Sequence, residues 1–259
     1  MLRFRSLGSG STGNATLVEA GSGQRVSRLL VDCGLGVRQL DQRLARCGLT
    51  TADIDAIFIT HEHSDHIGCA RSIVLRQRVP IWMSPGTFAG MGAPDFEGLL
   101  REAGDGTRIE IGEMFLLPFT VPHDAREPLQ LRCSDGNRHL GILTDLGHAS
   151  AHVLQNLAAC HALLLEFNHD PDLLAGSAYH PALKKRVGGK FGHLSNQDAA
   201  EIVRAVNHPE LALVVAAHLS RQNNRPDLVR SALAQVLPDR DQEGIPVADP
   251  LQGTDWIPV

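Results

Sequence analysis

Four side chains of the kinds that bind metal ions stand within six residues, in the segment THEHSDHIG at 60–68. They are His61, His63, Asp65 and His66, and the apolar run 56–59 precedes them directly. A buried strand there would give the loop a rigid base, and His61 and His63, two residues apart, can point the same way. A site for one tetrahedral ion takes about four ligands in all. A loop that supplies four by itself therefore favours two ions over one.

Three more residues of metal-binding type follow other strand-like runs. His123 comes after the run 116–122, Asp145 after 139–144, and His218 after 211–217. The end of a strand is a rigid position, which metal ligands need. A buried histidine is more often a core residue than a ligand, so each of these gains its weight from the cluster at 61–66. Together they predict a metal site of seven ligands: His61, His63, Asp65, His66, His123, Asp145 and His218.

The elements that must position these side chains are mostly short strands. Strand-like runs cover 2–7, 15–20, 27–32, 55–60, 80–84, 107–112, 114–121, 129–134, 139–145, 161–168 and 211–219. The pair Asp135-Gly136 predicts a hairpin turn between two of them. The polar tail from about 239 carries a last predicted strand at 244–248.

Helical spacing of apolar residues occurs between and after these runs. It predicts helices at 37–48, 67–77, 96–103, 150–158, 196–206 and 226–237. Strand-rich halves joined by amphipathic helices indicate an α/β protein in which two sheets stack face to face between helices, an αββα sandwich. Without repeats or a linker, residues 1–259 are expected to form one domain.

The composition fits a globular soluble protein. Hydrophobic residues make up 43% of the chain and charged residues 20%, with a formal charge of −5. No apolar run approaches the roughly 20 residues of a membrane helix, and residues 1–14 lack a signal-peptide core, so we expect a cytoplasmic protein without a membrane partner. Five cysteines without a C-x-x-C pair predict reduced, mostly buried thiols: Cys33, Cys47, Cys69, Cys133 and Cys160.

The T-H-x-H-x-D-H-x-G loop with Asp32, His123, Asp145 and His218 resembles the five motifs of the metallo-β-lactamase superfamily, over about residues 6–226. That resemblance implies the αββα fold with a dinuclear site at the edge of both sheets. It assigns His61, His63 and His123 to one ion. It assigns Asp65, His66 and His218 to the other, with Asp145 as the bridge. Asp32 would orient the histidine loop rather than bind metal.

Further segments are similar to the YycJ/WalJ-type subgroup, which is related to RNase Z and the phosphodiesterase PhnP. These segments are SLGSGSTGNATLV, LLLEFNHD, GHLSN and AHLSRQNNRP. The similarity implies a metal-dependent phosphodiesterase or 5′→3′ exonuclease in which a metal-bridging hydroxide attacks phosphorus. Asp145 stands where the common dinuclear β-lactamases carry cysteine, and a harder site suits phosphate chemistry with Zn²⁺, Mn²⁺ or Fe.

Two residues are expected to be catalytic, Asp65 at the metals and His193 as a proton donor. His193 in GHLSN resembles the histidine that protonates the leaving alkoxide in related phosphodiesterases. Alternatively, His193 only precedes a helix that Ser195 and Asp198 cap. Both roles are compatible, because Ser195 can cap the helix while His193 faces the metals.

Substrate contacts are predicted at Asn168, His169, Asn223, Asn224, Lys184, Lys185 and Lys190. The asparagines and His169 follow strand ends or His218, where they could meet substrate or simply fix loops. The three lysines are the only ones in the chain and fall within 184–190, just before His193. They could hold a phosphate backbone, or form an ordinary solvated surface.

The expected substrate is nucleic acid, with three alternatives. A small cyclic phosphodiester would suit the same metals. A thioester or lactone, as in glyoxalase II, would require a substrate domain for which the short tail beyond 238 offers little room. A binding protein with an inactive site conflicts with the full ligand set. DNA or RNA, and a monomer or a homodimer, are left open.

Overall fold

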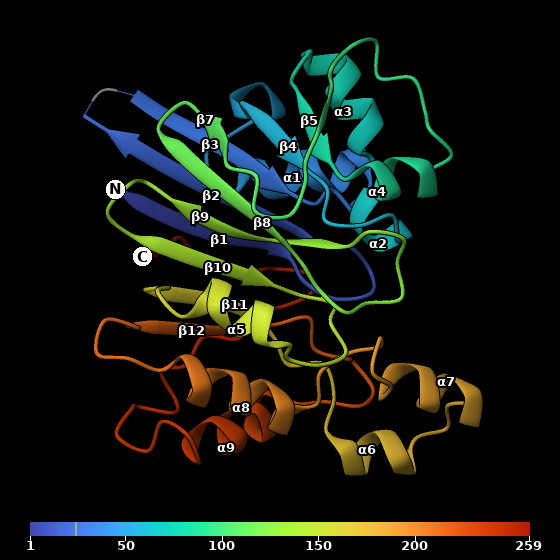
Figure 1. Cartoon of the computed structure of the whole chain (residues 1–259), viewed down its shortest axis with the longest axis vertical. Coiled ribbons are helices and arrows are strands. Elements are labelled where there is room, and N and C mark those ends of the chain that lie inside the picture. The colour runs from blue at the N-terminus through green and yellow to red at the C-terminus, as the bar shows by residue number, and fades with distance from the viewer. Residues whose placement is uncertain (24) are drawn as a thin grey trace.

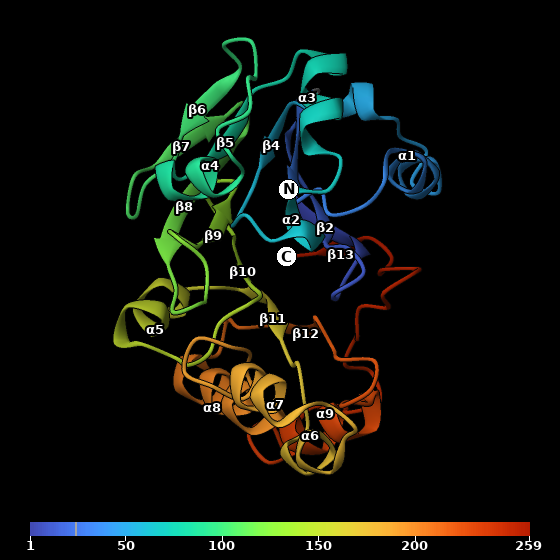
Figure 2. The same cartoon turned by 90° about the vertical axis from the view of Figure 1, so that its right-hand side faces the viewer.

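The computed structural model describes residues 1–23 and 25–259. Two sheets pack face to face, and helices cover their outer sides (Figures 1 and 2). One sheet has the order β13-β1-β2-β3-β4-β5-β6, and the other has the order β12-β11-β10-β9-β8-β7. The predicted αββα sandwich is therefore confirmed.

The first sheet is antiparallel from β13 to β3 and parallel from β3 to β6. Its strands are β1 Leu2–Gly8, β2 Ala15–Ser22, β3 Arg25–Val31, β4 Ala56–Phe58, β5 Ile81–Met83, β6 Leu100–Glu102 and β13 Ile257–Pro258. The second sheet is antiparallel from β7 to β10 and parallel from β10 to β12. Its strands are β7 Ile109–Ile111, β8 Met114–Thr120, β9 Leu129–Ser134, β10 His139–Leu143, β11 Ala162–Glu166 and β12 Leu213–Ala217.

The helices are short. They are α1 Val37–Ala45, α2 Ser64–Ile67, α3 Ala70–Gln77, α4 Pro85–Gly90, α5 Ala151–Leu157, α6 Pro171–Gly176, α7 Pro181–Val187, α8 Asn196–Val206 and α9 Pro226–Ala234, with a 3₁₀ turn η1 at Thr51–Asp53. Helix α8 begins where Ser195 Oγ accepts a hydrogen bond from Asp198 N at 3.1 Å, as the predicted cap requires. Its buried face, Ala199, Ile202 and Val203, packs on the second sheet.

Apolar side chains from both sheets fill the space between them, including Phe4 and Phe58 from the first and Leu116 and Leu131 from the second. Strand β11 is buried at every position, because a strand in the middle of a covered sheet contacts apolar neighbours on both faces. Burial of apolar surface stabilises this core by roughly 20–33 cal/mol per Å². The strand ends, where the predicted metal ligands lie, are therefore held rigidly.

Two predictions of local structure were wrong, and a third helix starts later than predicted. The expected helix at 96–103 contains β6, because pairing with β5 overrides the weak helical pattern of a short segment. The expected strand at 244–248 forms a single bridge, Val247 with Ala216, and the chain instead ends in β13 against β1. The expected helix at 67–77 begins only at Ala70, after a break at Gly68 with φ of 26°.

The cysteines agree with the prediction of reduced, mostly buried thiols. All five cysteines are free thiols, and four of them are buried. Cys33 and Cys69 lie with their sulfur atoms 3.4 Å apart. Within the described residues, no helix is long and apolar enough to cross a membrane.

Candidate metal centre

Tight turns at three strand ends bring the ligands together. Asp32 after β3, Asp145 after β10 and His218 after β12 have φ values of 60°, 58° and 56°. Such left-handed conformations are uncommon for residues other than glycine and cluster at functional sites, where the surrounding structure holds them in place. They end the strands abruptly, so the chain turns at the edge shared by both sheets.

The loops at this edge pack closely. Asn14 N donates a hydrogen bond to the Asp65 carbonyl at 2.8 Å, and Gly34 N donates to the Asn14 carbonyl at 2.8 Å. Any side chain at Gly34 would overlap the Asp65 carbonyl, so only glycine permits this approach. The segment after β3 thereby packs against the predicted metal-binding loop, residues 60–68, and supports it.

All seven predicted ligands lie in overlapping groups whose nitrogen and oxygen atoms are within 4.8 Å of one another. These groups are His61, His63 and His123; Asp65, His66 and His218; His61, His66 and Asp145; and Asp145, Glu166, His193 and His218. Within the first group, His63 Nδ1 lies 3.1 Å from His61 Nε2 and 3.3 Å from His123 Nε2. Asp145 joins two of the groups, which is the position that a bridging ligand needs.

Unpaired buried atoms show that these residues fit divalent cations. Among the described residues, His218 Nε2 and Asp145 Oδ2 are buried without a hydrogen-bond partner, although His66 Nε2 lies 3.1 Å from that oxygen. His61 and His66 are fully buried. Buried polar atoms without partners are costly, and a coordinated cation would satisfy them.

The protonation of the cluster suits metal binding. Burial, followed by the neighbouring His66, holds the pKa of His61 well below its ordinary value, so this imidazole is neutral and ready to coordinate. Burial likewise lowers the pKa of His123. Burial also opposes the charged form of His66, but Asp32 and Asp145 outweigh it and raise the pKa of that imidazole to about 10. A cation at this position would therefore displace a proton.

Asp32 makes the contacts of an orienting residue. Its carboxylate accepts hydrogen bonds from Thr60 N at 2.9 Å and Thr60 Oγ1 at 3.0 Å, and from His66 Nδ1 at 2.8 Å. With Nδ1 fixed in this way, His66 directs Nε2 toward Asp145.

Glu166, at the end of β11, belongs to the site and was missed by the sequence reasoning. It is fully buried, and its Oε1 accepts hydrogen bonds from His193 Nδ1 at 2.9 Å and His218 Nδ1 at 2.8 Å. Burial opposes its ionisation, but the two imidazoles, His193 first, lower the pKa of Glu166 to about 2. The signal was a single acid inside the apolar run LLLEF, two residues before the predicted Asn168.

A cleft with a volume of about 390 Å³ opens over the metal-binding cluster. Its floor includes His63, Asp65, Asp145, His193 and His218, and its far wall includes Tyr179, Leu183, Arg186 and Val187. The wall belongs to α7 and the connection that joins it to α6, and the two helices lie next to each other at one end of the molecule in both views (Figures 1 and 2). The cleft therefore has a polar, metal-binding floor and a largely apolar wall.

The predicted substrate residues occupy different positions around this cleft. Asn168 and Asn223 border it. His169 is buried beside it, and the amide of Asn224 is occupied by Phe167 O and by the side chain of Asn196.

The basic segment 184–190 forms most of α7 and the turn after it. Lys184 Nζ donates to the Ala175 carbonyl at 2.5 Å, while Lys185 and Lys190 are exposed outside the residues that line the cleft. Arg186 borders the cleft instead and pairs with Asp124 at 2.6 Å.

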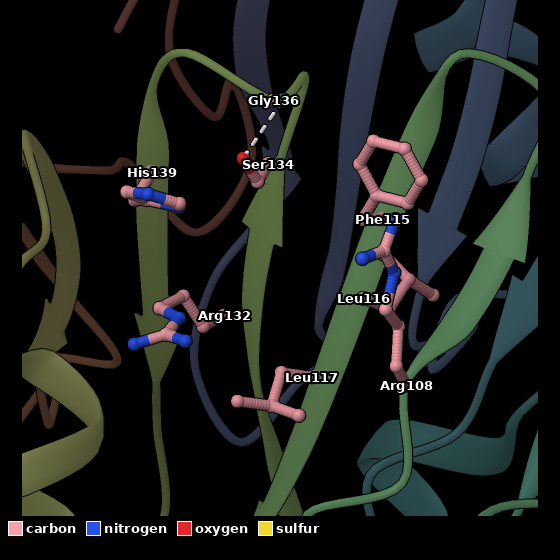
Figure 3. A pocket seen from close by; sticks show the side chains of 8 residues that line it. All are labelled: Arg108, Phe115, Leu116, Leu117, Arg132, Ser134, Gly136 and His139. Atoms are coloured by element: carbon pink, nitrogen blue, oxygen red, sulfur yellow. Dashed lines mark hydrogen bonds between the residues drawn. The ribbon is translucent and has the colours of Figure 1, made fainter.

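A second hollow of about 300 Å³ lies on the outer face of the second sheet, with Arg108 and Phe115 on one side and Arg132 and His139 on the other (Figure 3). Arg108 covers the ring of Phe115, with its Cζ atom 3.8 Å from the ring centroid. His139 begins the strand whose other end leads to Asp145. None of the metal-binding groups found among the described residues lies here, so the chemistry belongs to the cleft.

Comparisons with known proteins agree with this geometry. Residues 27–218 match the Beta-lactamase superfamily domain. Exodeoxyribonuclease YycJ of Bacillus anthracis is 32% identical over 244 residues, which cover 92% of this chain and 90% of that protein. Exodeoxyribonuclease WalJ of Streptococcus pneumoniae is 29% identical over 244 residues, covering 92% and 89%. The metallo-beta-lactamase fold protein YhfI of Bacillus subtilis shares the fold, with a TM-score of 0.74 and 15% identity over 99% of this chain and 98% of that one.

The similarity to the YycJ/WalJ subgroup that the motifs predicted is thus confirmed over most of the chain. Both the matched residues and the two-sheet fold include the strand ends that carry the ligand cluster. The chain belongs to the β-lactamase superfamily.

Proposed function

We propose that this protein is a metal-dependent phosphodiesterase that degrades DNA as a 5′→3′ exonuclease. The observation that carries the proposal is the buried ligand cluster at the floor of a cleft that also holds the paired His193 and Glu166. The similarity to two exodeoxyribonucleases over most of the chain supports DNA as the substrate. The fold also implies that a divalent metal binds here.

The seven ligands fit two divalent ions, Zn²⁺ or Mn²⁺, with Fe as a further option. We assign His61, His63 and His123 to one ion, Asp65, His66 and His218 to the other, and Asp145 to a position between them. When bound, such ions lower the pKa of a water molecule and stabilise charge on the phosphoryl group.

His193 is the proposed donor of the proton that the leaving sugar oxygen needs. Burial works against its charged form, but Glu166 outweighs burial and raises the pKa of His193. The imidazole is therefore protonated over a wider pH range, as a general acid requires. Asp65 borders the same cleft, where its carboxylate can accept a hydrogen bond from the attacking water.

We extend the proposal to the chain as a whole. Residues 1–259 would act as one domain, because the central core draws on both sheets and on Ala248 and Ile257 near the end of the chain. The cytoplasmic location stays a prediction. The lysines of 184–190 are proposed to hold the substrate's backbone beyond the cleft, with Arg186 at its wall.

The test uses DNA and RNA, single- and double-stranded, labelled at either end. Protein treated with a chelator should be inactive and should recover with Mn²⁺ or Zn²⁺. A 5′→3′ exonuclease releases a 5′ label at once as a mononucleotide and a 3′ label only late. Intact nucleic acid together with hydrolysis of S-lactoylglutathione would refute the proposal in favour of a thioesterase.

A further inference from the structure

One polar side chain in the cleft has no role in the chemistry described so far. Asn223 is fully buried and borders the cleft, yet neither atom of its amide has a hydrogen-bond partner among the described residues. Its backbone is fixed, because Asn223 N donates to Ser220 Oγ at 3.2 Å and its carbonyl accepts from Asp170 N at 2.8 Å. A rigidly placed amide left unpaired in a cleft is what a ligand that both donates and accepts would complete.

The neighbouring asparagine shows the contrast. Asn224 Nδ2 donates to Phe167 O at 2.7 Å and to Asn196 Oδ1 at 2.8 Å, and its Oδ1 accepts from Arg225 N at 2.8 Å. Its amide is satisfied within the protein and holds the loop. The loop therefore does not need the side chain of Asn223 for its own stability.

Tyr179, the chain's one tyrosine, borders the same cleft from the wall. It lies in the connection between α6 and α7, and Leu183 and Val187 of α7 continue the apolar surface beside it. The hydrogen bond from Asp170 N to the Asn223 carbonyl joins the start of this segment to the Asn223 loop. A phosphate group alone uses none of this surface, whereas a planar ring can stack on it.

We propose that Tyr179 and Asn223 form a subsite for the nucleobase beside the scissile phosphate. The base stacks on the Tyr179 ring, and the Asn223 amide donates to and accepts from the base edge. The proposal deepens the proposed function and rests on it. It makes these two residues determinants of specificity that leave the metal-binding cluster untouched.

The test compares two esters that share the leaving group and differ in the base: the p-nitrophenyl ester of thymidine 5′-monophosphate and ethyl p-nitrophenyl phosphate. Tyr179→Ala should raise KM for the nucleoside ester by about 5- to 150-fold, the range for losing one stacked base, and leave the ethyl ester unchanged. Tyr179→Phe should keep the wild-type KM, because stacking needs only the ring.

Asn223→Ala should also raise KM for the nucleoside ester alone and should leave the melting temperature unchanged. Asn224→Ala is the matched control, and it should lower the melting temperature because four internal hydrogen bonds are lost. Equal effects of Tyr179→Ala on both esters, or none on either, would overturn the subsite.

A direct binding measurement separates failure of the subsite from failure of the proposed function. If the wild-type protein hydrolyses neither ester, the phosphodiesterase proposal fails. The subsite is then judged by calorimetry on metal-free protein with thymidine 5′-monophosphate and with 2-deoxyribose 5-phosphate. Tighter binding of the nucleotide that Tyr179→Ala abolishes supports the subsite, and equal binding of both by the wild type refutes it.

Discussion

Replacing Glu166 by glutamine changes one atom at the point where the proton donor and a metal ligand meet. Oε1 of Glu166 accepts from His193 Nδ1 and His218 Nδ1, while Oε2 accepts from Leu146 N at 3.3 Å and Leu194 N at 3.0 Å. Glutamine has a single acceptor atom. Its NH₂ group, which is a donor, must therefore face either two imidazole N–H groups or two backbone N–H groups.

The cost follows from the charge and the hydrogen bonds. A pKa lowered from 4.5 to about 2 corresponds to roughly 3 kcal/mol, at 1.36 kcal/mol for each pH unit. Because the folded pKa of Glu166 is the lower one, this contribution is present above pH 4.5 and is lost as the pH falls toward 2. Glu166→Gln should therefore lower the free energy of unfolding of metal-free protein at pH 7 by about 3 kcal/mol.

Catalysis should suffer in proportion to the need for a proton. A sugar alkoxide must be protonated as it leaves, and losing the oriented donor should reduce kcat on DNA by about 10²–10⁴-fold. A p-nitrophenolate leaves without a proton, so hydrolysis of bis-p-nitrophenyl phosphate should fall much less. The pKa of His193 should also drop, which moves the alkaline limb of the pH–rate profile for DNA to lower pH.

Glu19→Gln is the matched control. Glu19 is also buried, but it pairs with Arg3 and with Arg28, at 2.8 Å from the latter, and lies on β2 away from the cleft. Its replacement should reduce stability without changing the ratio of the two activities. If Glu166→Gln reduced both activities equally while metal content stayed normal, the proton-donor argument for His193 would be refuted.

Three further predictions concern the metals and the substrate. Asp145→Ala should lose bound metal and nearly all activity, whereas His193→Ala should keep its metal and lose DNA hydrolysis. Metal analysis checks both variants, and loss of metal from His193→Ala would show that His193 is a ligand. Metal binding should release protons, because nearby carboxylates outweigh burial and raise the pKa of His66 and of His218. The affinity for metal should therefore rise with pH. Calorimetry in buffers of different ionisation enthalpy measures the protons released, and a release of none would contradict this prediction. Replacing the three lysines of 184–190 with glutamine should reduce the salt dependence of DNA binding by about one unit of slope per lost phosphate contact and spare bis-p-nitrophenyl phosphate, whereas Arg186→Gln at the cleft wall should affect both substrates.

The cluster of candidate metal ligands was predictable because its signal is local. The segment 60–68 carries four of them, and the remaining three each follow an apolar run that became β8, β10 or β12. Strand ends in a covered sheet converge on one edge whatever the loop lengths between them. The sequence pattern therefore contained both the residue types and their meeting place.

Glu166 and α7 were not predictable, for two different reasons. The partners of Glu166 lie 27 and 52 residues away, so its role depends on the pairing of β11 with β12, which no local pattern encodes. Helix α7 has no buried residue and hence no apolar stripe for periodicity to detect. The strand β6 was missed for a similar reason, since its partner fixes its conformation.

The cleft joins two parts that are packed differently, because most residues of its floor lie at buried strand ends, whereas α7 in its wall has no buried residue. The floor lies on strand ends that the central core holds, whereas α7 contacts the rest of the chain through few bonds. Those bonds include Arg186 with Asp124, an exposed pair worth about 0–1 kcal/mol, and His193 N with the Val187 carbonyl at 2.8 Å. Asp124 follows a proposed metal ligand, and Val187 holds the proposed proton donor. Two hydrogen-bonded contacts thus connect the α7 wall to a residue next to a proposed metal ligand and to the proposed proton donor. We expect substitutions of wall residues outside these two contacts to alter the choice of substrate without changing metal content.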